Sequence, residues 1–520
     1  MTTGKKCDNL LIREANWIGD AVMTMPALRA LKLANPDARI TLLAKPGVSP
    51  LFEKDRNVDE IILYKDTYQG LTGKFKLVQE IRKHVFCMAM LFQNAFGAAF
   101  IAFLAGIPER IGYNRDGRRL LLTEAVPFDD RAKALHHIEY YLNLVEKAGF
   151  PARFEIPWIY LTAEERLAAR NKLKALRRPV IGINPGATYG SSKRWPPGRF
   201  AEVTYRVISE MQGSAVIFGG PSEEQIAKEI QQKTLNFLPH TLLHHSLLNL
   251  AGKTGLRELI SLISECDLLV TNDSGPMHIG YAVRTPVVAI FGSTSSEHTG
   301  PVGKKDIVIK KALDCAPCFE RECKKHNLKC MDMISSEEVF EAVKERVTIK
   351  RAVFFDRDGT LCKDPGYLHR IEEFEVFPEI GSLARLKERG FSLIGVSNQS
   401  GVARGLVDEE FVKLINTIFL DTYGFDGFYY CPHHPAEHCS CRKPEPGLLL
   451  EARADYNIDL KRSFVVGDKD LDMLLAKAAG ATGILVRAGQ NTVSTNADYT
   501  VENIKEAVEL IIRKDSTKEE

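Results

Sequence analysis

The amino-acid sequence predicts an α/β protein whose strands form parallel sheets. Short apolar runs alternate with amphipathic helical patterns along the whole chain, as in successive βαβ units. The pattern restarts twice, after Trp158 and near Thr348, so three separate sheets are expected. The chain has 520 residues, which suits about three to four domains of ordinary size. We therefore predict three Rossmann-like units in succession.

The first series of elements lies in the N-terminal third of the chain. Strands are expected at residues 9–12, 38–44 and 60–64, and helices at 25–34, 75–84 and 136–149. The most apolar stretch, residues 86–108, is interrupted by Gln93 and Asn94. A membrane span needs about 20 continuous apolar residues, so this stretch predicts a buried strand and helix instead.

A second series begins after a charged helix expected at Thr162–Leu176. Its strands are expected at 180–186, 214–220, 267–273 and 286–292. A helix at 335–347 then precedes a new apolar strand at 351–355. We accordingly divide the chain into domains at residues 1–175, 176–348 and 349–513, with a disordered tail at 514–520.

Composition narrows the class of protein. The formal net charge of +2 does not favour nucleic-acid binding, for which a strongly basic domain is typical. The N-terminus has no long apolar core, so we expect no signal peptide and a cytoplasmic protein. Eight of the eleven cysteines form two clusters, which without a secretion signal indicate metal binding rather than disulfides. The clusters are Cys315, Cys318, Cys323 and Cys330, and Cys362, Cys431, Cys439 and Cys441.

The most specific motif, Asp356-Arg357-Asp358-Gly359-Thr360, directly follows an apolar strand. The end of a strand is where an open parallel sheet presents its active site. Two carboxylates two residues apart at such a position can divide the chemistry between them. One can bind Mg2+ and attack phosphorus, and the other can protonate the leaving oxygen.

Three later side chains are also suited to phosphate chemistry. Ser397 follows a predicted strand, and Lys443 can neutralise charge on a phosphoryl group. Asp468 follows another predicted strand and offers a second carboxylate to Mg2+. Ser397 also begins a cluster of hydroxyl and amide groups with Asn398, Gln399 and Ser400.

Through these motifs, residues 350–513 resemble the phosphatases of the haloacid dehalogenase (HAD) family. The resemblance implies that Asp356 is the nucleophile, which forms an aspartyl-phosphate. Asp358 would be the general acid and then the base for water. Ser397 and Lys443 would stabilise the transferring phosphoryl group. Mg2+ would bind Asp356, the backbone carbonyl of Asp358, and Asp468.

A short loop rich in cysteine and histidine precedes Lys443. Its C-x-H and C-x-C pairs offer four soft ligands, the type that Zn2+ takes in a closed structural site. The expected ligands are Cys431, His433, Cys439 and Cys441, with His434 and His438 as alternative donors or surface residues. We expect zinc to fold this loop over the active site in place of a large cap domain.

Such a loop is found in two related groups of phosphatases, which act on heptose 1,7-bisphosphate and on histidinol phosphate. The sequence resembles the first group more closely, because Asp364 and Tyr367 follow the nucleophile as in the heptose enzymes, where that stretch contacts substrate. Arg442 and Lys469 match positions that recognise the distal part of the substrate. Histidinol phosphate remains the alternative substrate.

In the N-terminal part, Asp20 lies at a predicted strand-to-helix turn, where it fits either a helix N-cap or a group facing a cleft. Two loops of the second series suit a diphosphate. One carries Thr188 and Lys193. The other opens a helix, whose free N–H groups favour anions, and carries Asp273, Ser274, Gly275 and His278. Together the loops indicate a nucleotide-diphosphate sugar held between two domains.

Residues 8–347 resemble the bacterial lipopolysaccharide heptosyltransferases, and most of all the type II enzymes. The matching segments are WIGDAV from Trp17, KRWPPGRFA from Lys193 and NDSGPMH from Asn272. The resemblance implies a GT-B fold of two Rossmann-like domains, with ADP-heptose as donor and inversion at the anomeric carbon. Asp20 would deprotonate the acceptor hydroxyl. The donor would be held by Thr188, Lys193, Asp273, Ser274, Gly275 and His278.

Taken together, the two resemblances predict a bifunctional enzyme of lipopolysaccharide inner-core heptose metabolism. One half would transfer heptose from ADP-heptose to an inner-core heptose. The other would hydrolyse the 7-phosphate of D-glycero-β-D-manno-heptose 1,7-bisphosphate. The alternative for the N-terminal half is an inactive binding scaffold. Peripheral contact with the inner face of the inner membrane is left open.

The sequence leaves the role of three groups of residues open between two alternatives. Arg110, Arg115, Arg118 and Arg119 form either a solvated loop or a contact with acidic groups of the acceptor. The pair His136 and His137 either lines the same acceptor groove or has no such role. The first cysteine cluster has C-x2-C-x4-C-x6-C spacing, which departs from the usual two pairs of a zinc site, so metal binding there is left open.

Overall fold

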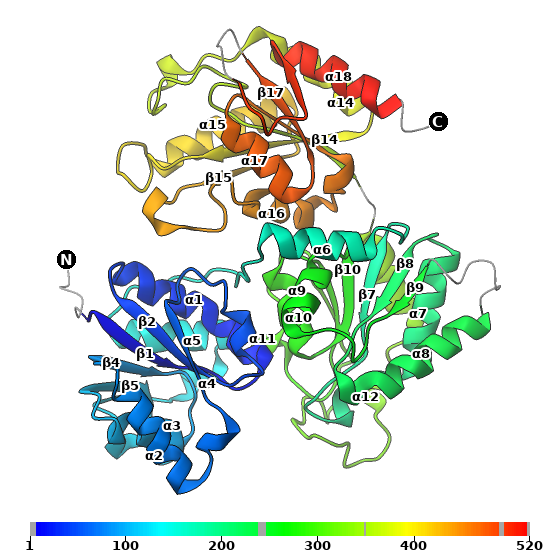
Figure 1. Ribbon diagram of the computed structural model, residues 1–520. Coiled ribbons are helices and arrows are strands. Elements are labelled where there is room, and N and C mark those ends of the chain that lie inside the picture. Colours follow the sequence, from blue (N-terminus) through cyan, green and yellow to red (C-terminus); the bar gives the residue numbers. More distant parts are fainter. Residues whose placement is uncertain (1–6, 238–245, 348–349, 488–492, 517–520) are drawn as a thin grey trace. The chain divides into compact units, whose positions relative to one another are not determined.

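The structure is a computed structural model that describes residues 7–237, 246–347, 350–487 and 493–516 (Figure 1). It divides into two compact units, Met1–Val347 and Thr348–Glu520. The first unit contains two six-stranded sheets and the second unit contains one. All pairs of neighbouring strands are parallel. The prediction of an α/β protein with three parallel sheets is confirmed.

The first sheet has the strand order β3-β2-β1-β4-β5-β6. Its strands are β1 (Asn9–Arg13), β2 (Arg39–Ala44), β3 (Glu60–Leu63), β4 (Met88–Leu91), β5 (Glu109–Tyr113) and β6 (Glu124–Val126). The helices that accompany it are α1 (Ile18–Ala34), α2 (Gly70–Ile81), α3 (Phe96–Leu104), α4 (Asp130–Ala134) and α5 (His137–Lys147). The apolar stretch at 86–108 forms β4 and the short helix α3, as predicted.

The second sheet has the order β12-β11-β10-β7-β8-β9 and follows helix α6 (Ala163–Leu173). Its strands are β7 (Val180–Asn184), β8 (Ser214–Ile217), β9 (Leu247–Asn249), β10 (Leu268–Asn272), β11 (Val287–Ile290) and β12 (Ile307–Ile309). Its helices are α7 (Pro197–Ser209), α8 (Glu224–Phe237), α9 (Leu256–Ser264), α10 (Gly275–Ala282), α11 (Ser296–Thr299), α12 (Lys329–Asp332) and α13 (Ser336–Arg346).

The third sheet forms the second unit and has the order β15-β14-β13-β16-β17-β18. Its strands are β13 (Arg351–Phe355), β14 (Phe391–Asn398), β15 (Gly427–Cys431), β16 (Phe464–Gly467), β17 (Thr482–Val486) and β18 (Tyr499–Val501). Its helices are α14 (Ala384–Glu388), α15 (Glu409–Tyr423), α16 (Gly447–Tyr456), α17 (Asp470–Ala479) and α18 (Ile504–Ser516). Because α18 extends to Ser516, residues 514–516 are helical and not part of a disordered tail; residues 517–520 lie outside the described residues.

All three sheets share one topology, and this positions the sites. In each, the chain builds three strands outward, returns to the middle and builds three strands in the other direction. The direction therefore reverses between β1 and β4, between β7 and β10, and between β13 and β16. A parallel sheet binds ligands at the carboxyl ends of the strands beside such a switch point. Asp20, Asp273, Asp356 and Asp468 all follow strands at these three positions.

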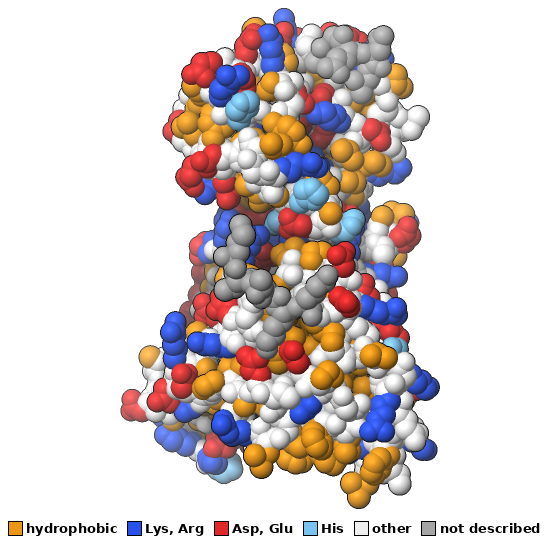
Figure 2. All heavy atoms as spheres, turned by 90° about the vertical axis from the view of Figure 1, so that its left-hand side faces the viewer, with side chains coloured by type: hydrophobic (Ala, Val, Ile, Leu, Met, Phe, Trp, Pro, Cys, Tyr) orange, Lys and Arg blue, Asp and Glu red, His pale blue; other side chains and the backbone are white. Residues whose placement is uncertain are grey.

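The central strands are apolar because helices cover both of their faces. Every residue of β7 and β10 is buried, and so are four of the five residues of β13. In the part of the chain that the structure describes, no helix is both long and apolar enough to span a membrane. On the face shown in Figure 2, basic and acidic side chains are interspersed, in line with the net charge of +2.

Candidate active sites and metal centres

A compact group of charged side chains lies at the switch point of the third sheet. Lys443 contacts Asp356 through its ammonium group, and its Nζ lies 2.7 Å from Oδ1 of Asp472. Asp356, Asp468 and Asp472 each place a carboxylate oxygen within 4.8 Å of the other two. The lysine and the three carboxylates come from three separate segments, because Asp468 and Asp472 share one, and the parallel sheet brings these segments to one edge.

Asp358 is held in a fixed orientation beside this group. Arg357 donates two hydrogen bonds to its carboxylate, at 2.9 and 3.0 Å. Gln399 Nε2 lies 2.7 Å from Asp358 Oδ2 and 2.6 Å from Ser397 Oγ. Ser397 is buried and its Oγ lies 3.5 Å from the same Asp358 oxygen. The side chain of Asp358 is thus oriented by Arg357 and Gln399, which follow two neighbouring strands, β13 and β14.

Two glycines leave room for the carboxylates. Gly359 has a φ of +93°, and a Cβ there would lie 2.4 Å from Asp468 Oδ2. A Cβ on Gly467 would lie 2.4 Å from Asp472. Only glycine fits at positions where a side chain approaches the backbone so closely. These positions explain why the sequence places glycine beside both acidic motifs.

The electrostatics of this group favour a bound cation. Burial raises the pKa of Asp356 to about 8, and the charge of Lys443 offsets this only in part. Burial also raises the pKa of Asp468. Three carboxylates face one ammonium, which leaves an excess of negative charge. A divalent cation with a preference for oxygen ligands, such as Mg2+, fits this donor set and would keep the carboxylates ionised.

The residues expected to contact the distal part of a substrate surround this group. Lys469 Nζ lies 2.9 Å from Asp364 Oδ2, and both side chains are partly exposed. A Cβ on Gly401 would lie 2.9 Å from Tyr367, which places that ring against the segment after Ser400. Among the described residues, Arg442 Nη1 is a buried donor without a hydrogen-bond partner. Asn398 accepts a hydrogen bond of 3.0 Å from the backbone N–H of Lys443 and so fixes its segment.

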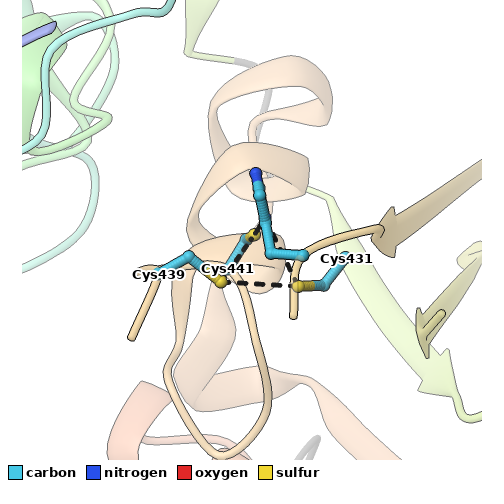
Figure 3. A group of neighbouring side chains, drawn as sticks. Cys431, Cys439 and Cys441 are labelled. Atoms are coloured by element: carbon cyan, nitrogen blue, oxygen red, sulfur yellow. Dashed lines mark hydrogen bonds between the residues drawn. The ribbon is translucent and has the colours of Figure 1, made fainter. Parts of the chain in front are cut away.

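Four candidate zinc ligands converge at the end of β15 and in the loop that follows it (Figure 3). Cys431 Sγ lies 3.4 Å from Cys439 Sγ, and Cys441 Sγ lies 3.5 Å from Cys439 Sγ. His433 Nδ1 lies 3.1 Å from Cys441 Sγ and 3.5 Å from Cys431 Sγ. Sulfurs that share a tetrahedral zinc ion through bonds of about 2.3 Å lie about 3.8 Å apart, so this geometry fits zinc. His434 instead accepts a hydrogen bond from the backbone N–H of Ala436.

In the first unit, Asp20 lies in the first turn of α1 and opens onto a pocket of about 300 Å3. His137 at the start of α5 places Nδ1 3.4 Å from Asp20 Oδ1. The pocket is lined by Ala15, Asn16, Trp17, Asp20, Phe92, Gln93, Asn94, Arg115, Phe128, Ala132, Lys133, Leu135, His137, Tyr140 and Tyr141. A carboxylate with a histidine partner at the wall of a polar pocket can accept a proton from a bound hydroxyl.

The second sheet brings cationic and polar groups close to Asp20. A Cβ on Gly19 would lie 2.8 Å from the ring of His278, so α10 of the second sheet packs directly against α1. Burial lowers the pKa of His278 to about 3, so this histidine is neutral, and the charges of Asp20 and Lys193 both act on it. Lys193 Nζ lies 2.5 Å from Asp273 Oδ2. Asp20, Lys193 and His278 therefore share one neighbourhood.

The loops around Lys193 have the features of an anion site. Ser274 is the N-cap of α10, and Gly275 begins the helix. A Cβ on Gly275 would lie 2.9 Å from Ile18, so glycine is required for the close approach of α1. Asn184 donates hydrogen bonds of 3.0 Å to Thr271 Oγ1 and to Ser274 Oγ. Thr188 is exposed.

Comparison with known proteins decides the family of both parts. Residues 74–329 match the family described as "Glycosyltransferase family 9 (heptosyltransferase)", and residues 440–507 match the HAD-hydrolase-like family. A lipooligosaccharide heptosyltransferase 2 from Haemophilus influenzae is 35% identical over 319 residues, which cover 58% of this chain and 88% of the relative. A D-glycero-beta-D-manno-heptose-1,7-bisphosphate 7-phosphatase from Photorhabdus laumondii is 44% identical over 163 residues, which cover 28% of this chain and 85% of the relative.

The chain belongs to glycosyltransferase family 9 in its N-terminal part and to the HAD phosphatases in its C-terminal part. Among solved structures, the E. coli ADP-heptose LPS heptosyltransferase II is 28% identical with a TM-score of 0.56, and the match covers 65% of this chain and 98% of that one. The resemblances predicted from sequence are confirmed for both parts. We call Met1–Val347 the transferase unit and Thr348–Glu520 the phosphatase unit.

The arginines singled out from sequence have different roles in the transferase unit. Arg118 is buried and donates to the carbonyls of Tyr113 and Gln93. Arg110 donates to the carbonyl of Leu121 at 2.7 Å. Both therefore hold the fold. Arg115 lies 4.2 Å above the ring of Phe128 and lines the pocket beside Asp20.

Of the two adjacent histidines, His137 lines the pocket, whereas His136 Nε2 donates to the carbonyl of Gly300 at 3.0 Å. Sequence reasoning missed Gln93 and Asn94 as pocket residues of the transferase unit. Their signal was present, because both are polar side chains inside the most apolar stretch, directly after a strand. Nothing in the local sequence indicated the disulfide between Cys7 and Cys87, which joins positions 80 residues apart outside both cysteine clusters.

Proposed function

We propose that this chain is a bifunctional enzyme of lipopolysaccharide inner-core heptose metabolism. The transferase unit moves heptose from ADP-heptose to an inner-core heptose. The phosphatase unit hydrolyses the 7-phosphate of D-glycero-β-D-manno-heptose 1,7-bisphosphate. The observation that supports this most strongly is that each unit resembles relatives named for one of these two activities, at 35% and 44% identity.

In the phosphatase reaction, Asp356 attacks phosphorus and the bond to the 7-oxygen of the sugar breaks. Asp358, oriented by Arg357 and Gln399, gives its proton to the departing oxygen and later takes one from the attacking water. Lys443 offsets charge on the phosphoryl oxygens. Magnesium held by Asp356, Asp468 and the Asp358 carbonyl would supply further positive charge. Zinc held by Cys431, His433, Cys439 and Cys441 would fix the loop that carries Arg442 and Lys443.

In the transferase reaction, Asp20 takes the proton of the acceptor hydroxyl as that oxygen attacks the anomeric carbon of the heptose. ADP leaves, and Lys193 lies where it offsets the charge that develops on the diphosphate. Thr188, Ser274 and Gly275 line the start of the same anion site, with Asp273 fixing Lys193. The acceptor is a lipid-anchored saccharide, so we place this reaction at the inner face of the inner membrane, with peripheral contact only.

The phosphatase proposal is tested by its choice of substrate. Purified full-length chain should release phosphate from heptose 1,7-bisphosphate with a higher kcat/KM than from histidinol phosphate. Arg442→Ala should lower kcat/KM for the bisphosphate by about 10- to 100-fold, because a charged hydrogen bond to substrate is lost. Arg404→Ala changes an exposed arginine and is the matched control. Preference for histidinol phosphate would contradict the proposal.

The transferase proposal is tested by release of ADP from ADP-heptose in the presence of a heptosylated acceptor. Asp20→Ala should reduce kcat by about 10^2- to 10^4-fold, because the general base is removed. Asp37→Ala, which removes an exposed carboxylate of the same unit, should leave kcat unchanged. Absence of ADP release, with wild type and Asp20→Ala alike, would support an inactive scaffold instead.

A further inference from the structure

The first cysteine cluster lies outside both proposed active sites. Three of its cysteines lie in the connection from β12 to α12 of the transferase unit, and Cys330 lies in α12 itself. Cys315, Cys318, Cys323 and Cys330 are all free thiols. Residues 310–328 contain no helix or strand, and none of them is buried. Ordering a residue's backbone costs about 1–2 kcal/mol, and here no buried apolar side chain offsets that cost. The segment therefore has neither secondary structure nor buried apolar side chains to hold it in one conformation.

Nevertheless, this segment contacts the loop that carries Lys193. The backbone N–H of Ser192 donates to the carbonyl of Arg321 at 3.1 Å. The hydroxyl of Tyr189 donates to the carbonyl of Phe319 at 2.6 Å. A Cβ on Gly190 would lie 2.1 Å from the Arg321 carbonyl oxygen. The residues between Cys318 and Cys323 therefore hold the loop at 189–193 in place through hydrogen bonds and close backbone contact.

The backbone around Cys323 is shaped to hold a thiolate. His326 and Leu328 adopt left-handed conformations, with φ of +50° and +41°. The backbone N–H groups of Asn327 and Leu328 donate hydrogen bonds to the Cys323 sulfur. The thiolate is the form of cysteine that binds a metal. A non-glycine residue with positive φ is uncommon, and two in three residues mark a turn with a specific purpose.

The other three thiols lie near enough for their charges to act on one another. Cys315, Cys318 and Cys323 each lie within electrostatic range of the Cys330 sulfur. No three of these sulfurs lie within 4.8 Å of one another, in contrast to the ligands at Cys431–Cys441. Ligation of one ion by all four therefore requires their sulfurs to move closer together.

We propose that Cys315, Cys318, Cys323 and Cys330 bind one thiophilic divalent cation, of which Zn2+ and Fe2+ are the common examples in four-thiolate sites. Binding releases the thiol protons to solvent and cross-links a segment that has no core. The bound ion fixes Phe319–Arg321 and thereby positions the loop that carries Lys193. The metal site goes beyond the proposed function and does not depend on it; only its effect on donor binding does.

The test is metal analysis of the full-length chain, purified under reducing conditions without chelators. The background variant Cys431→Ser/Cys439→Ser removes the phosphatase site. We expect this variant to retain about one equivalent of zinc or iron per chain, since one further four-ligand site remains. Adding Cys318→Ser and Cys323→Ser should remove that equivalent. Cys266→Ala, which changes a buried cysteine elsewhere in the same unit, should retain it.

A variant that replaces one metal ligand by another distinguishes loss of the metal site from loss of the fold. Cys318 is exposed, so Cys318→His replaces one metal ligand by another without disturbing a core and should retain the ion. In Cys318→Ser/Cys323→Ser alone, which keeps the cysteines of the phosphatase unit, KM for ADP-heptose should rise by about 10-fold or more, while phosphate release stays unchanged. A metal-free background variant, or full retention of metal after loss of Cys318 and Cys323, would overturn the site. Loss of metal with an unchanged KM would overturn its positioning role.

Discussion

The two active sites differ in how their groups are brought together. In the phosphatase unit, Asp356, Lys443 and Asp472 contact one another at the edge of a single sheet. In the transferase unit, Asp20 belongs to the first sheet and Lys193 to the second, and no hydrogen bond joins them among those of the described residues. The phosphatase site is complete at the edge of one sheet, whereas the transferase site depends on the alignment of two sheets.

This difference determines where substitutions should act. The reacting groups of the phosphatase site already contact one another. A substitution of one of them should therefore lower the rate of the chemical step and should not change the alignment of the other groups. In the transferase unit, the contact of Gly19 with His278 and the hydrogen bond from His136 to Gly300 connect the two sheets. A change at those contacts should misalign donor and acceptor without removing a reacting group.

The largest effect is expected for Asp356→Asn. An amide cannot form the aspartyl-phosphate, so phosphate release should fall by about 10^4-fold or more. ADP release by the same preparation should not change, because the transferase unit has its own core and its own site. Both activities are measured on one sample. A loss of both activities would show that the two units depend on each other and that the two sites are not independent.

Much of the phosphatase site could be predicted from sequence because its chemistry is local. Asp356 and Asp358 lie directly after a strand, and the ligands Cys431 to Cys441 lie within one loop. The same holds for the three sheets, since alternating apolar and amphipathic segments set their order.

The contacts that complete the transferase site are not local, and the sequence left the role of His137 open. His137 and Asp20 are 117 residues apart, and they meet only because α5 packs beside α1. The burial of Arg118 likewise follows from tertiary packing, since its neighbours in sequence are exposed. Residue type and spacing thus predict which polar groups lie at strand ends, but not which side chains from separate elements come into contact.

A second prediction concerns the alignment of the two sheets. Gly19→Ala places a methyl group 2.8 Å from His278 Cδ2 and must displace α10 or its histidine. We expect kcat/KM for heptosyl transfer to fall by about 10- to 100-fold, as for a displacement near 1 Å, while phosphate release is unchanged. Gly97→Ala is the matched control, because this helical glycine has no atom within 4 Å of its ideal Cβ. Equal activity of both variants would indicate that the sheets are not aligned through α1 and α10.

The smallest effect is expected at Glu14, a buried residue beside the transferase pocket. Burial raises the pKa of its carboxyl from 4.5 to about 8, and one of its oxygens has no hydrogen-bond partner among the described residues. Between these values the folded protein holds a proton that the unfolded chain has lost. The contribution of Glu14 to stability is therefore fully present below pH 4.5 and is lost as the pH rises through 8.

Glu14→Gln stays neutral, so its free energy of unfolding relative to wild type should increase by about 1 kcal/mol or more from pH 5 to pH 9. Tryptophan fluorescence during denaturation isolates this unit, because all three tryptophans, Trp17, Trp158 and Trp195, lie within it. Glu53→Gln removes an exposed carboxylate of the same unit and should show no such trend. If the two variants follow the same pH dependence, Glu14 is ionised in the folded protein. The pocket beside Asp20 would then carry a second negative charge, which would change the affinity expected for an acidic acceptor.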